Sequence, residues 1–255
     1  MTYVEGLRAV VTGAGSGIGA AIARRLAAEG ARVVVNDLDA DRAREVSASI
    51  GAFAAPGDAA TDEGAAALVR AAREAFGGVD LFVANAGVAV GGGPETPDHE
   101  WELAWQVNVL AHVHAARHVL PEWLERGRGH FVATVSAAGL LTMPGAAPYA
   151  VTKHAALAFA EWMAITYGDR GVRVQALCPQ GVRTPMLIAS GDLGRAVLER
   201  DALEPDAVAE LTVTSLEDGP FLLLPHPEVA RYYAARAADP DAWLAGMRRM
   251  TSSLP

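Results

Sequence analysis

A serine, a tyrosine and a lysine near the middle of the chain have the residue types and the spacing for proton transfer. Tyr149 follows Ser136 by thirteen positions, and Lys153 follows Tyr149 by four. On a helix, the four-residue step places phenol and ammonium on one face, one turn apart. A phenol titrates near ~10, so bringing its pKa close to neutrality requires roughly 4 kcal/mol. A positive charge at about 4 Å supplies about that much at an effective dielectric constant of ~20. The pattern therefore predicts a tyrosine base activated by a lysine; the alternative is a chance pairing on an ordinary helix.

The composition is that of a folded globular protein with a negative net charge. Of the 255 residues, 51% are hydrophobic and 20% are charged, and the formal net charge is −9. These values predict one α/β domain with an ample core and argue against nucleic acid or an anionic membrane as partner. We detect no export signal and no apolar run of membrane-spanning length. With Cys178 as the single cysteine, interpreted as a small buried residue at a strand end, we expect a cytoplasmic protein.

Short β-rich runs alternate with longer helical patterns, which is typical of a parallel sheet. We predict strands at residues 7–12, 32–37, 52–55, 81–84, 131–136, 172–178 and 221–224. We predict helices at residues 17–29, 40–49, 62–76, 97–125, 148–167, 205–216 and, as one or two helices, 228–250. The chain is expected to be a single domain (1–255). It comprises a core at 1–184, a mobile helical substrate lid at 185–204, and the last helix, the last strand and the C-terminal helices at 205–255.

A glycine-rich turn joins the first predicted strand to the first predicted helix. Its members are Gly13, Ser16, Gly17, Ile18 and Gly19. Glycines allow the backbone to turn tightly and to approach a pyrophosphate, which then lies at the N-terminus of the helix among free N–H groups. Because the turn stands between an apolar strand and an amphipathic helix, it predicts a dinucleotide site.

An acidic residue, Asp37, ends the second predicted strand. A carboxylate at this place accepts hydrogen bonds from both adenosine-ribose hydroxyls and repels a 2′-phosphate. Ser16 and Leu38 offer no positive charge to such a phosphate, and Arg42 is the one cation nearby. We therefore predict NAD rather than NADP as the cofactor. The alternative is that Asp37 caps the following helix.

Residues 7–186 resemble the short-chain dehydrogenase/reductase family, because several motifs occur in the family's order. The glycine turn looks like its cofactor turn, and Asp58, with Ala59 beside it, looks like its adenine-contacting acid. Asn-Ala-Gly follows the fourth strand, as in the family. The resemblance implies cofactor contacts from Gly13, Ser16, Gly17, Ile18, Gly19, Asp37, Leu38, Asp58, Ala59, Asn85, Ala86, Gly87, Tyr149, Lys153, Pro179, Gln180, Val182 and Thr184.

The resemblance also implies a catalytic group consisting of Asn108, Ser136, Tyr149 and Lys153. Tyr149 would be the general acid or base and Ser136 would bind the substrate oxygen. Lys153 would lower the tyrosine pKa and hold the ribose, and Asn108 would hold a water that relays protons to Lys153. The implied fold is a doubly wound Rossmann fold with a mostly parallel seven-stranded sheet in the order 3-2-1-4-5-6-7, flanked by helices. The helices at 97–125 and 148–167 would form the interfaces of a homotetramer or homodimer.

The chain departs from the family pattern at two places. Gln180 stands where the family usually has glycine, so we expect it to contact cofactor or substrate and leave its backbone geometry open. The usual ending of the family is replaced by FLLLPHPEV and a helical tail, in which we interpret His226, between two prolines, as structural. We predict no metal site, because the histidines at 112, 114 and 118 have no acidic or cysteine partner to complete a ligand set.

The segments expected around the substrate are mainly apolar. They contribute Val88, Val90, Leu140, Leu141, Met143, Met186, Leu187, Ile188, Val197 and Leu198. Such a pocket favours a small apolar secondary alcohol or ketone. The sequence thus predicts an NAD-dependent oxidoreductase. The alternatives are an NADP-preferring ketoreductase or hydroxysteroid dehydrogenase of the same family, a non-catalytic NAD-binding regulator, and a sugar epimerase or dehydratase, for which the residues after Thr184 leave little room.

Overall fold

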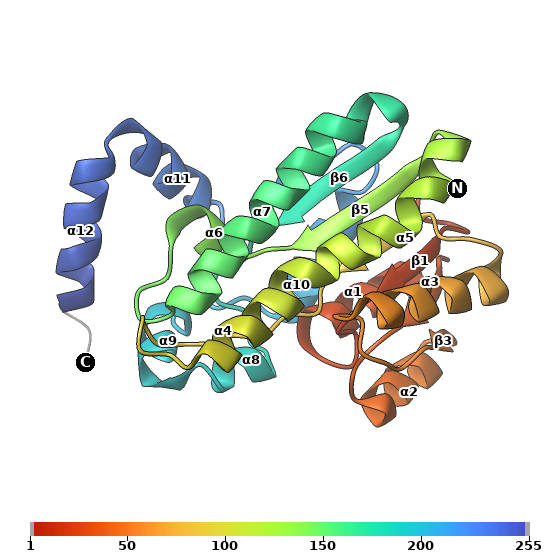
Figure 1. Ribbon diagram of the computed structural model, residues 1–255, viewed down its shortest axis with the longest axis horizontal. Coiled ribbons are helices and arrows are strands. Elements are labelled where there is room, and N and C mark those ends of the chain that lie inside the picture. The colour runs from red at the N-terminus through yellow and green to blue at the C-terminus, as the bar shows by residue number, and fades with distance from the viewer. Residues whose placement is uncertain (1–2, 253–255) are drawn as a thin grey trace.

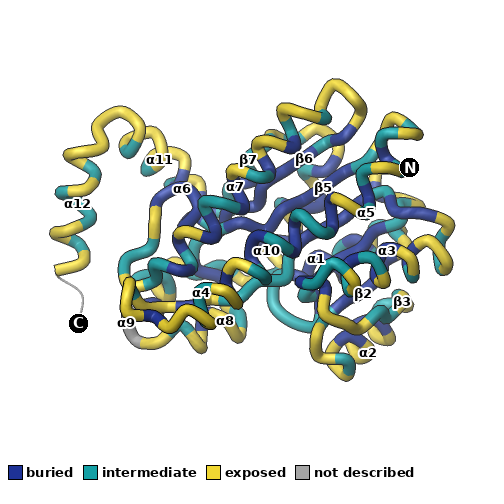
Figure 2. The backbone as a smooth tube through the Cα atoms, viewed as in Figure 1, coloured by how far each residue is buried: buried dark blue, intermediate teal, exposed yellow. Residues whose placement is uncertain are grey.

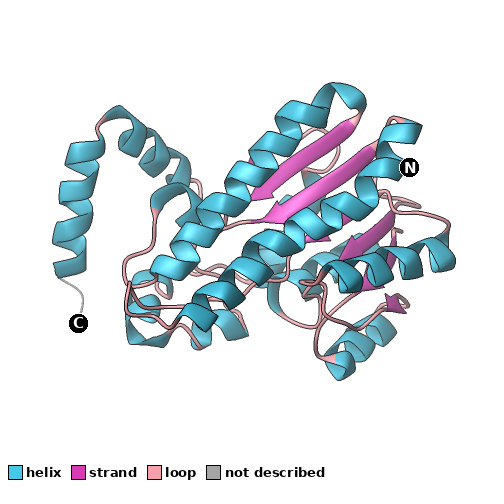
Figure 3. Ribbon diagram, viewed as in Figure 1, coloured by secondary structure: helices cyan, strands magenta, loops and turns pink. Residues whose placement is uncertain are grey.

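A sheet of parallel strands forms the centre of the molecule (Figure 3). The computed structural model describes residues 3–252, except for the side chains of residues 192, 193 and 196. Within these residues seven strands pair in the order β3-β2-β1-β4-β5-β6-β7, as predicted, and every pair is parallel. The strands are β1 (Arg8–Val11), β2 (Arg32–Val35), β3 (Phe53–Ala54), β4 (Leu81–Ala84), β5 (Gly129–Thr134), β6 (Val172–Leu177) and β7 (Leu222–Leu223).

Helices cover both faces of this sheet (Figure 1). One face carries α1 (Gly17–Ala28), α2 (Ala40–Ser49) and α10 (Pro205–Thr214), and the other carries α3 (Asp62–Phe76), α5 (Ala111–Arg126) and α7 (Ala147–Tyr167). Successive strand residues point to opposite faces. Phe131 therefore packs under the α3, α5 and α7 layer, and Val132 packs under the other. Since both faces are covered, the central strands are continuous apolar runs, dark blue in Figure 2.

Side chains and glycines at helix ends explain several of the predicted boundaries. The carboxylate of Asp39 accepts from the N–H groups of Asp41 and Arg42 at the start of α2, and the hydroxyl of Thr61 accepts from Gly64 at the start of α3. The glycine at position 77 ends α3 in the left-handed conformation that a residue without Cβ adopts most easily. Both helices have the predicted bounds, 40–49 and 62–76.

The long helix predicted over about residues 97–125 is present, but it contains a turn of a different helix type. The segment consists of α4 (Asp98–Trp105), a π-helical turn (Gln106–Leu110) and α5. A π-turn inserts one residue into the helical repeat and often occurs at functional sites. Asn108 lies within this turn and is completely buried, bonded to the backbone of Val88 and to Thr152. These tertiary bonds stabilise the wider turn, and sequence periodicity does not register them.

The second half of the chain adds helices at the carboxyl edge of the sheet. α6 (Ala138–Leu141) was not predicted, and the predicted lid consists of α8 (Pro185–Ile188) and α9 (Gly191–Leu198). The tail forms α11 (Glu228–Ala238) and α12 (Pro240–Ser252); α12 stands apart from the body in Figures 1 and 2. Among residues 3–252, no helix combines the length and apolar character needed to cross a bilayer.

Candidate active site

The four residues predicted to be catalytic meet at the carboxyl edge of the sheet. Ser136 follows β5, Tyr149 and Lys153 lie on the first turns of α7, and Asn108 is on the π-turn. The hydroxyl oxygen of Ser136 accepts the N–H of Ala138 at 3.1 Å, and it lies 3.4 Å from the carbonyl oxygen of Pro179 after β6. The serine is therefore fixed between the ends of two neighbouring strands.

The ammonium group of Lys153 is buried against the end of β5. Its Nζ donates to the carbonyl of Thr134 at 2.9 Å and lies 5.8 Å from the centre of the Tyr149 ring, while the residue is only 3% exposed. The loop after β4 passes close by. A Cβ added to Gly87 would lie 3.4 Å from that Nζ and 3.3 Å from Oδ1 of Asn108. Glycine at this position thus lets the loop approach both groups.

Burial shifts the pKa values of both Tyr149 and Lys153. Burial raises the pKa of Tyr149, and a hydrogen bond with Ser136 offsets part of that increase. Burial also lowers the pKa of Lys153 to about 8. Both shifts arise because desolvation disfavours the charged forms, phenolate and ammonium. That Lys153, together with the cationic nicotinamide, lowers the pKa of the phenol stays a prediction.

Asn108 connects three parts of the site through its side-chain amide. Its Oδ1 accepts the N–H of Val88 at 2.9 Å, and its Nδ2 donates to the carbonyl of Val88 at 3.0 Å and to the hydroxyl of Thr152 at 3.1 Å. Asn108 thereby links Thr152 of α7 to the loop after β4.

The turn between β1 and α1 fits a dinucleotide phosphate. Gly13 has φ of 60°, and a Cβ added there would lie 2.9 Å from Cα of Ala86. The hydroxyl of Thr12 accepts the N–H groups of Asn85 and Ala86, both at 3.0 Å, which joins the turn to the loop after β4. Ser16, the N-cap of α1, makes no side-chain cap bond, so no side chain at the N-cap occupies the place of an anion at this helix end.

Asp37 closes the other side of the turn. Its Oδ2 accepts the N–H of Gly15 at 2.8 Å and its Oδ1 accepts the N–H of Asp39 at 3.0 Å. The alternative interpretation of Asp37 as a helix cap is wrong, since Asp39 caps α2. Leu38 is uncharged and 76% exposed. The guanidinium of Arg42 is paired with Asp39 at 3.2 Å. The carboxylate of Asp37, which is bonded to Gly15, is therefore the charge nearest to the turn.

The remaining predicted cofactor residues follow β3 and β6 along the same edge. Asp58 is exposed, and its Oδ1 accepts the N–H of Ala60 at 3.0 Å. Val182 pairs with Leu203 beyond the lid, and Thr184 caps α8 by accepting the N–H of Leu187 at 3.4 Å. Gln180 points toward the C-terminal segment.

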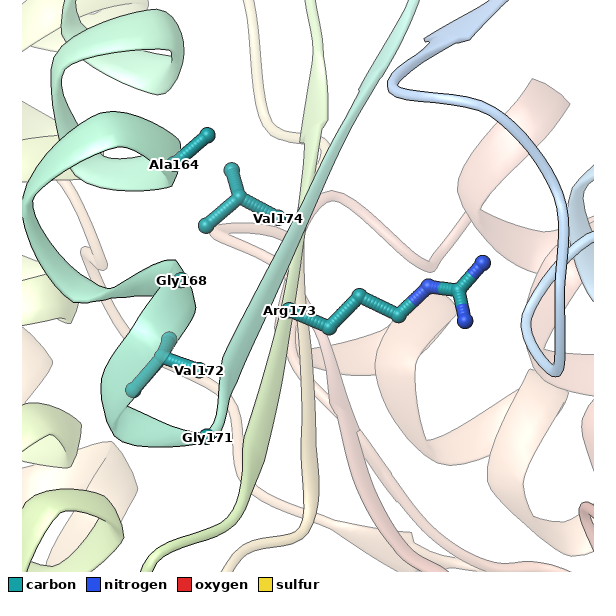
Figure 4. A pocket seen from close by; sticks show the side chains of 6 residues that line it. All are labelled: Ala164, Gly168, Gly171, Val172, Arg173 and Val174. Atoms are coloured by element: carbon teal, nitrogen blue, oxygen red, sulfur yellow. The ribbon is translucent and has the colours of Figure 1, made fainter.

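A depression of about 390 Å³ lies at the opposite edge of the sheet, where α7 ends and β6 begins (Figure 4). Val172 and Val174 point towards α7, whereas Arg173 points to the other side of the strand. Its guanidinium donates to the carbonyls of Glu217 and, at 2.6 Å, Gly219. Arg173 thus links β6 to the segment before β7. The depression lies at the end of the strands opposite to the candidate catalytic residues.

Comparison with known proteins agrees with this arrangement. The family model for short chain dehydrogenases matches residues 8–192. The chain belongs to the short-chain dehydrogenase family. This dehydrogenase is 40% identical over 197 residues to 1-deoxy-11-beta-hydroxypentalenate dehydrogenase of Streptomyces exfoliatus, covering 72% of this chain and 70% of the relative. It is 37% identical over 192 residues to 2,5-dichloro-2,5-cyclohexadiene-1,4-diol dehydrogenase of Sphingobium indicum, covering 73% and 77%.

A solved structure resembles the dehydrogenase over almost its full length. It is a short chain dehydrogenase/reductase from Burkholderia phymatum in complex with NAD, with a TM-score of 0.87 and 30% identity, covering 95% of this chain and 96% of that one. The chain is thus an oxidoreductase of a family whose members here act on hydroxyl groups, and a nicotinamide cofactor fits its β1–α1 turn.

Sequence reasoning missed two threonines of the dehydrogenase and grouped a core residue, Leu140, with the residues expected around the substrate. Thr12 joins the glycine turn to the loop after β4, and Thr152 accepts from Asn108. Each is adjacent in sequence to a recognised motif, which is the signal that would have found it. Leu140, predicted to line the substrate pocket, is completely buried and packs in the core, whereas Ile188 is 71% exposed.

Proposed function

We propose that this short-chain dehydrogenase interconverts an apolar secondary alcohol and its ketone with NAD, using Tyr149 as general acid and base. The observation that carries the proposal is the meeting of Ser136, Tyr149 and Lys153 at the carboxyl edge of the sheet, next to a glycine turn that fits a phosphate. An oxidised nicotinamide accepts hydride from carbon and adds a positive charge that favours phenolate.

The chain's own residues have distinct roles in this proposal. Tyr149 takes the proton from the alcohol oxygen during oxidation and returns it during reduction. Ser136 orients the same oxygen by hydrogen bonding. Lys153, whose Nζ lies 5.8 Å from the centre of the Tyr149 ring, places a positive charge near the phenol and holds the ribose hydroxyls of the cofactor. Asn108 keeps the π-turn next to the lysine and supports a water that relays the proton outwards.

NAD is favoured over NADP by the charge beside the glycine turn. The carboxylate of Asp37 is fixed by Gly15 and Asp39, so a 2′-phosphate there would face a negative charge. The similar protein from Burkholderia phymatum is in complex with NAD, which supports the same choice. An NADP-preferring ketoreductase or hydroxysteroid dehydrogenase is the second candidate.

An apolar substrate is favoured by the side chains around the edge. Of the apolar residues expected around the substrate, Met186 and Ile188 are exposed and Met143 is partly exposed, so these side chains offer apolar surface. Two relatives are named as dehydrogenases of a hydroxypentalenate and of a cyclohexadiene diol, which supports a hydroxylated substrate. A charged substrate would lose hydration in such a pocket without gaining a partner.

The test is a panel of secondary alcohols and ketones with NAD and with NADP, following the absorbance of the reduced cofactor. We expect turnover with NAD, and loss of turnover in Tyr149→Phe by at least about a thousandfold, because the phenol supplies the proton transfer. Binding of NADH to this variant should be retained. Substantial residual turnover in Tyr149→Phe would contradict the mechanism, and silence across the panel would favour a non-catalytic NAD-binding protein.

We also propose a homotetramer assembled through the outer faces of α4 and α7. Large apolar side chains are exposed there, notably Trp105, Trp162 and Ile165, the last at 84% exposure. Leaving such a patch in water is unfavourable for a monomer. Light scattering should give a mass about four times the 26.5 kDa of the chain. Ile165→Glu should lower that mass, while a monomeric wild-type protein would refute the proposal.

A further inference from the structure

Gln180, the residue that departs from the family pattern, is bonded to the C-terminal segment. Its backbone N–H donates to Nδ1 of His226 at 3.2 Å, and its side-chain Nε2 donates to Oε1 of Glu228 at 2.7 Å. Both partners belong to the segment that replaces the family's usual ending. The two departures recognised separately in the sequence are therefore in direct contact.

The ring of His226 has one defined orientation in this contact. Because Nδ1 accepts a hydrogen bond, it is unprotonated, and the neutral ring carries its proton on Nε2. The residue is 3% exposed, and its carbonyl accepts the N–H of Val229 at 3.0 Å in the first turn of α11. The histidine thus links the start of α11 to the end of β6.

Gln180 lies within a loop whose neighbours touch the catalytic edge. The carbonyl of Pro179 accepts the N–H of Ala137 at 2.8 Å and lies 3.4 Å from the Ser136 hydroxyl. On the other side, the carbonyl of Gly181 accepts the N–H of Leu203 at 3.0 Å, where the lid ends. Residues 179–184 are consequently held by the serine loop, by the lid and, through Gln180, by the tail.

The backbone at Gln180 needs no glycine. Thr142 is the only non-glycine residue with positive φ in the part of the chain that the structure describes, so the glutamine has an ordinary conformation. A second bond from α11 reaches the edge from the other side, where the guanidinium of Arg236 donates to the carbonyl of Leu140 and contacts His154 at 3.1 Å. α11 is therefore attached to α6 and α7, while the segment at its start is bonded to the loop after β6.

We infer that His226 and Glu228 are positioning residues that hold residues 179–184, through Gln180, beside Ser136. The nicotinamide half of the cofactor has to lie there if it is to exchange hydride with a substrate bound at Ser136. The inference rests on the proposed function. A glycine would give this loop neither the side-chain amide nor the link to Glu228. In this chain, the C-terminal segment that replaces the family's usual ending supplies both partners of the glutamine that replaces the family's glycine.

The experiment compares two probes on the same variants by calorimetry: NADH, which has the nicotinamide, and ADP-ribose, which lacks it. Glu228→Ala and His226→Leu each remove one partner of Gln180. We expect the Kd for NADH to rise about three- to tenfold, the effect of one lost hydrogen bond. The Kd for ADP-ribose should stay within about twofold, because the glycine turn is untouched.

One conservative change, one control and one double variant separate positioning from a general structural effect. Glu228→Gln keeps an oxygen acceptor for the glutamine amide, so its Kd for NADH should be close to that of the wild type. Asp241→Ala, an exposed acid at the start of α12, is the matched control and should change neither constant. Gln180→Gly combined with Glu228→Ala should cost no more than either change alone, because both remove the same bond.

The outcomes of this experiment distinguish failure of the positioning role from failure of the proposed function. An unchanged Kd for NADH in Glu228→Ala and His226→Leu, or an equal rise for both probes, would overturn the positioning role. Retained ADP-ribose binding shows that a variant is folded at the cofactor site. A wild-type protein that binds neither probe would instead refute the proposed function itself.

Discussion

At the scale of single residues, the site contains an ammonium and a phenol that burial pushes towards their neutral forms. Burial raises the pKa of Tyr149 and lowers that of Lys153 to about 8. Near pH 7 the lysine is still charged, but its proton is only weakly held. In the proposed mechanism, reaction through the phenolate of Tyr149 needs a second positive charge, and the oxidised nicotinamide supplies one. The pKa of Tyr149 should therefore be lower when the oxidised cofactor is bound.

The depressed pKa of Lys153 can be measured directly, because it is the only lysine in the sequence. Protein labelled with ¹³C at lysine Cε should show one side-chain resonance that titrates with a midpoint of about 8 instead of 10.5. The shift arises because the ammonium is desolvated and has a single carbonyl acceptor, that of Thr134, at 2.9 Å. In urea the same resonance should titrate normally, which serves as the internal control. A folded-state midpoint above 10 would contradict the burial argument.

At the scale of elements, most strands and helices could be predicted because local pattern determines them. The residues 81–84 form β4 as predicted, since a buried parallel strand is a continuous apolar run. The π-turn at Gln106–Leu110 and the short helix α6 could not be predicted. One inserted residue barely changes the hydrophobic period, and the bonds that hold Asn108 come from positions 20 and 44 residues away.

The same limit applies to the site. The glycine turn was visible in the sequence because it lies within a few positions, and the catalytic group was recognised because its residues occur in the order of the family's motifs. The contact of Gln180 with His226 was not, since the two are 46 residues apart and meet only through the fold. The sequence marked both positions as unusual, and the structure adds that they are bonded.

Asn108 allows a test at this scale, because it joins the π-turn to two other elements. Asn108→Ala removes the partners of both backbone groups of Val88 and of the Thr152 hydroxyl. We expect urea denaturation to show a loss of about 2–4 kcal/mol in the free energy of unfolding, since a buried unpaired polar group costs about 1–3 kcal/mol. Thr152→Val removes only one of these bonds and should cost less. Equal stability of Asn108→Ala and the wild type would show that the π-turn does not depend on this amide.

At the scale of the whole molecule, the parallel sheet collects the functional residues at one edge and leaves buried polar groups in the layers behind. Two histidines, at positions 112 and 130, are almost completely buried. His112 lies against Phe131 in an edge-on contact, with a ring-centre separation of 6.3 Å, and Lys153 is the charged group that acts on it. His130 bonds to the side chain of Gln175 at 3.0 Å, and Arg173 is its charged neighbour. Neither ring can take a proton without charging the core.

These histidines make the stability of the whole fold depend on pH. Burial lowers the pKa of both His112 and His130 from 6.5 to about 3. Between these values the unfolded chain binds more protons than the folded one, so stability is full above pH 6.5 and is lost as the pH falls. Each histidine contributes a slope of about 1.4 kcal/mol per pH unit, about 2.7 for the two together. Urea denaturation between pH 6.5 and 4.5 should show this slope before most carboxylates begin to titrate.

A variant of one buried histidine identifies the source of that slope. His112→Leu should reduce it by about 1.4 kcal/mol per pH unit, because one of the two histidines whose pKa is strongly lowered by folding is removed. At pH 7 the variant should be no less stable than the wild type. Both ring nitrogens of His112 are buried without a hydrogen-bond partner among the described residues, so an apolar side chain of similar size relieves that cost. His99→Gln, at an exposed position, is the control and should leave the slope unchanged. A wild-type stability that is flat between pH 6.5 and 4.5 would mean that these two rings are not held neutral, and the packing of α5 against β5 would then have to admit a charge.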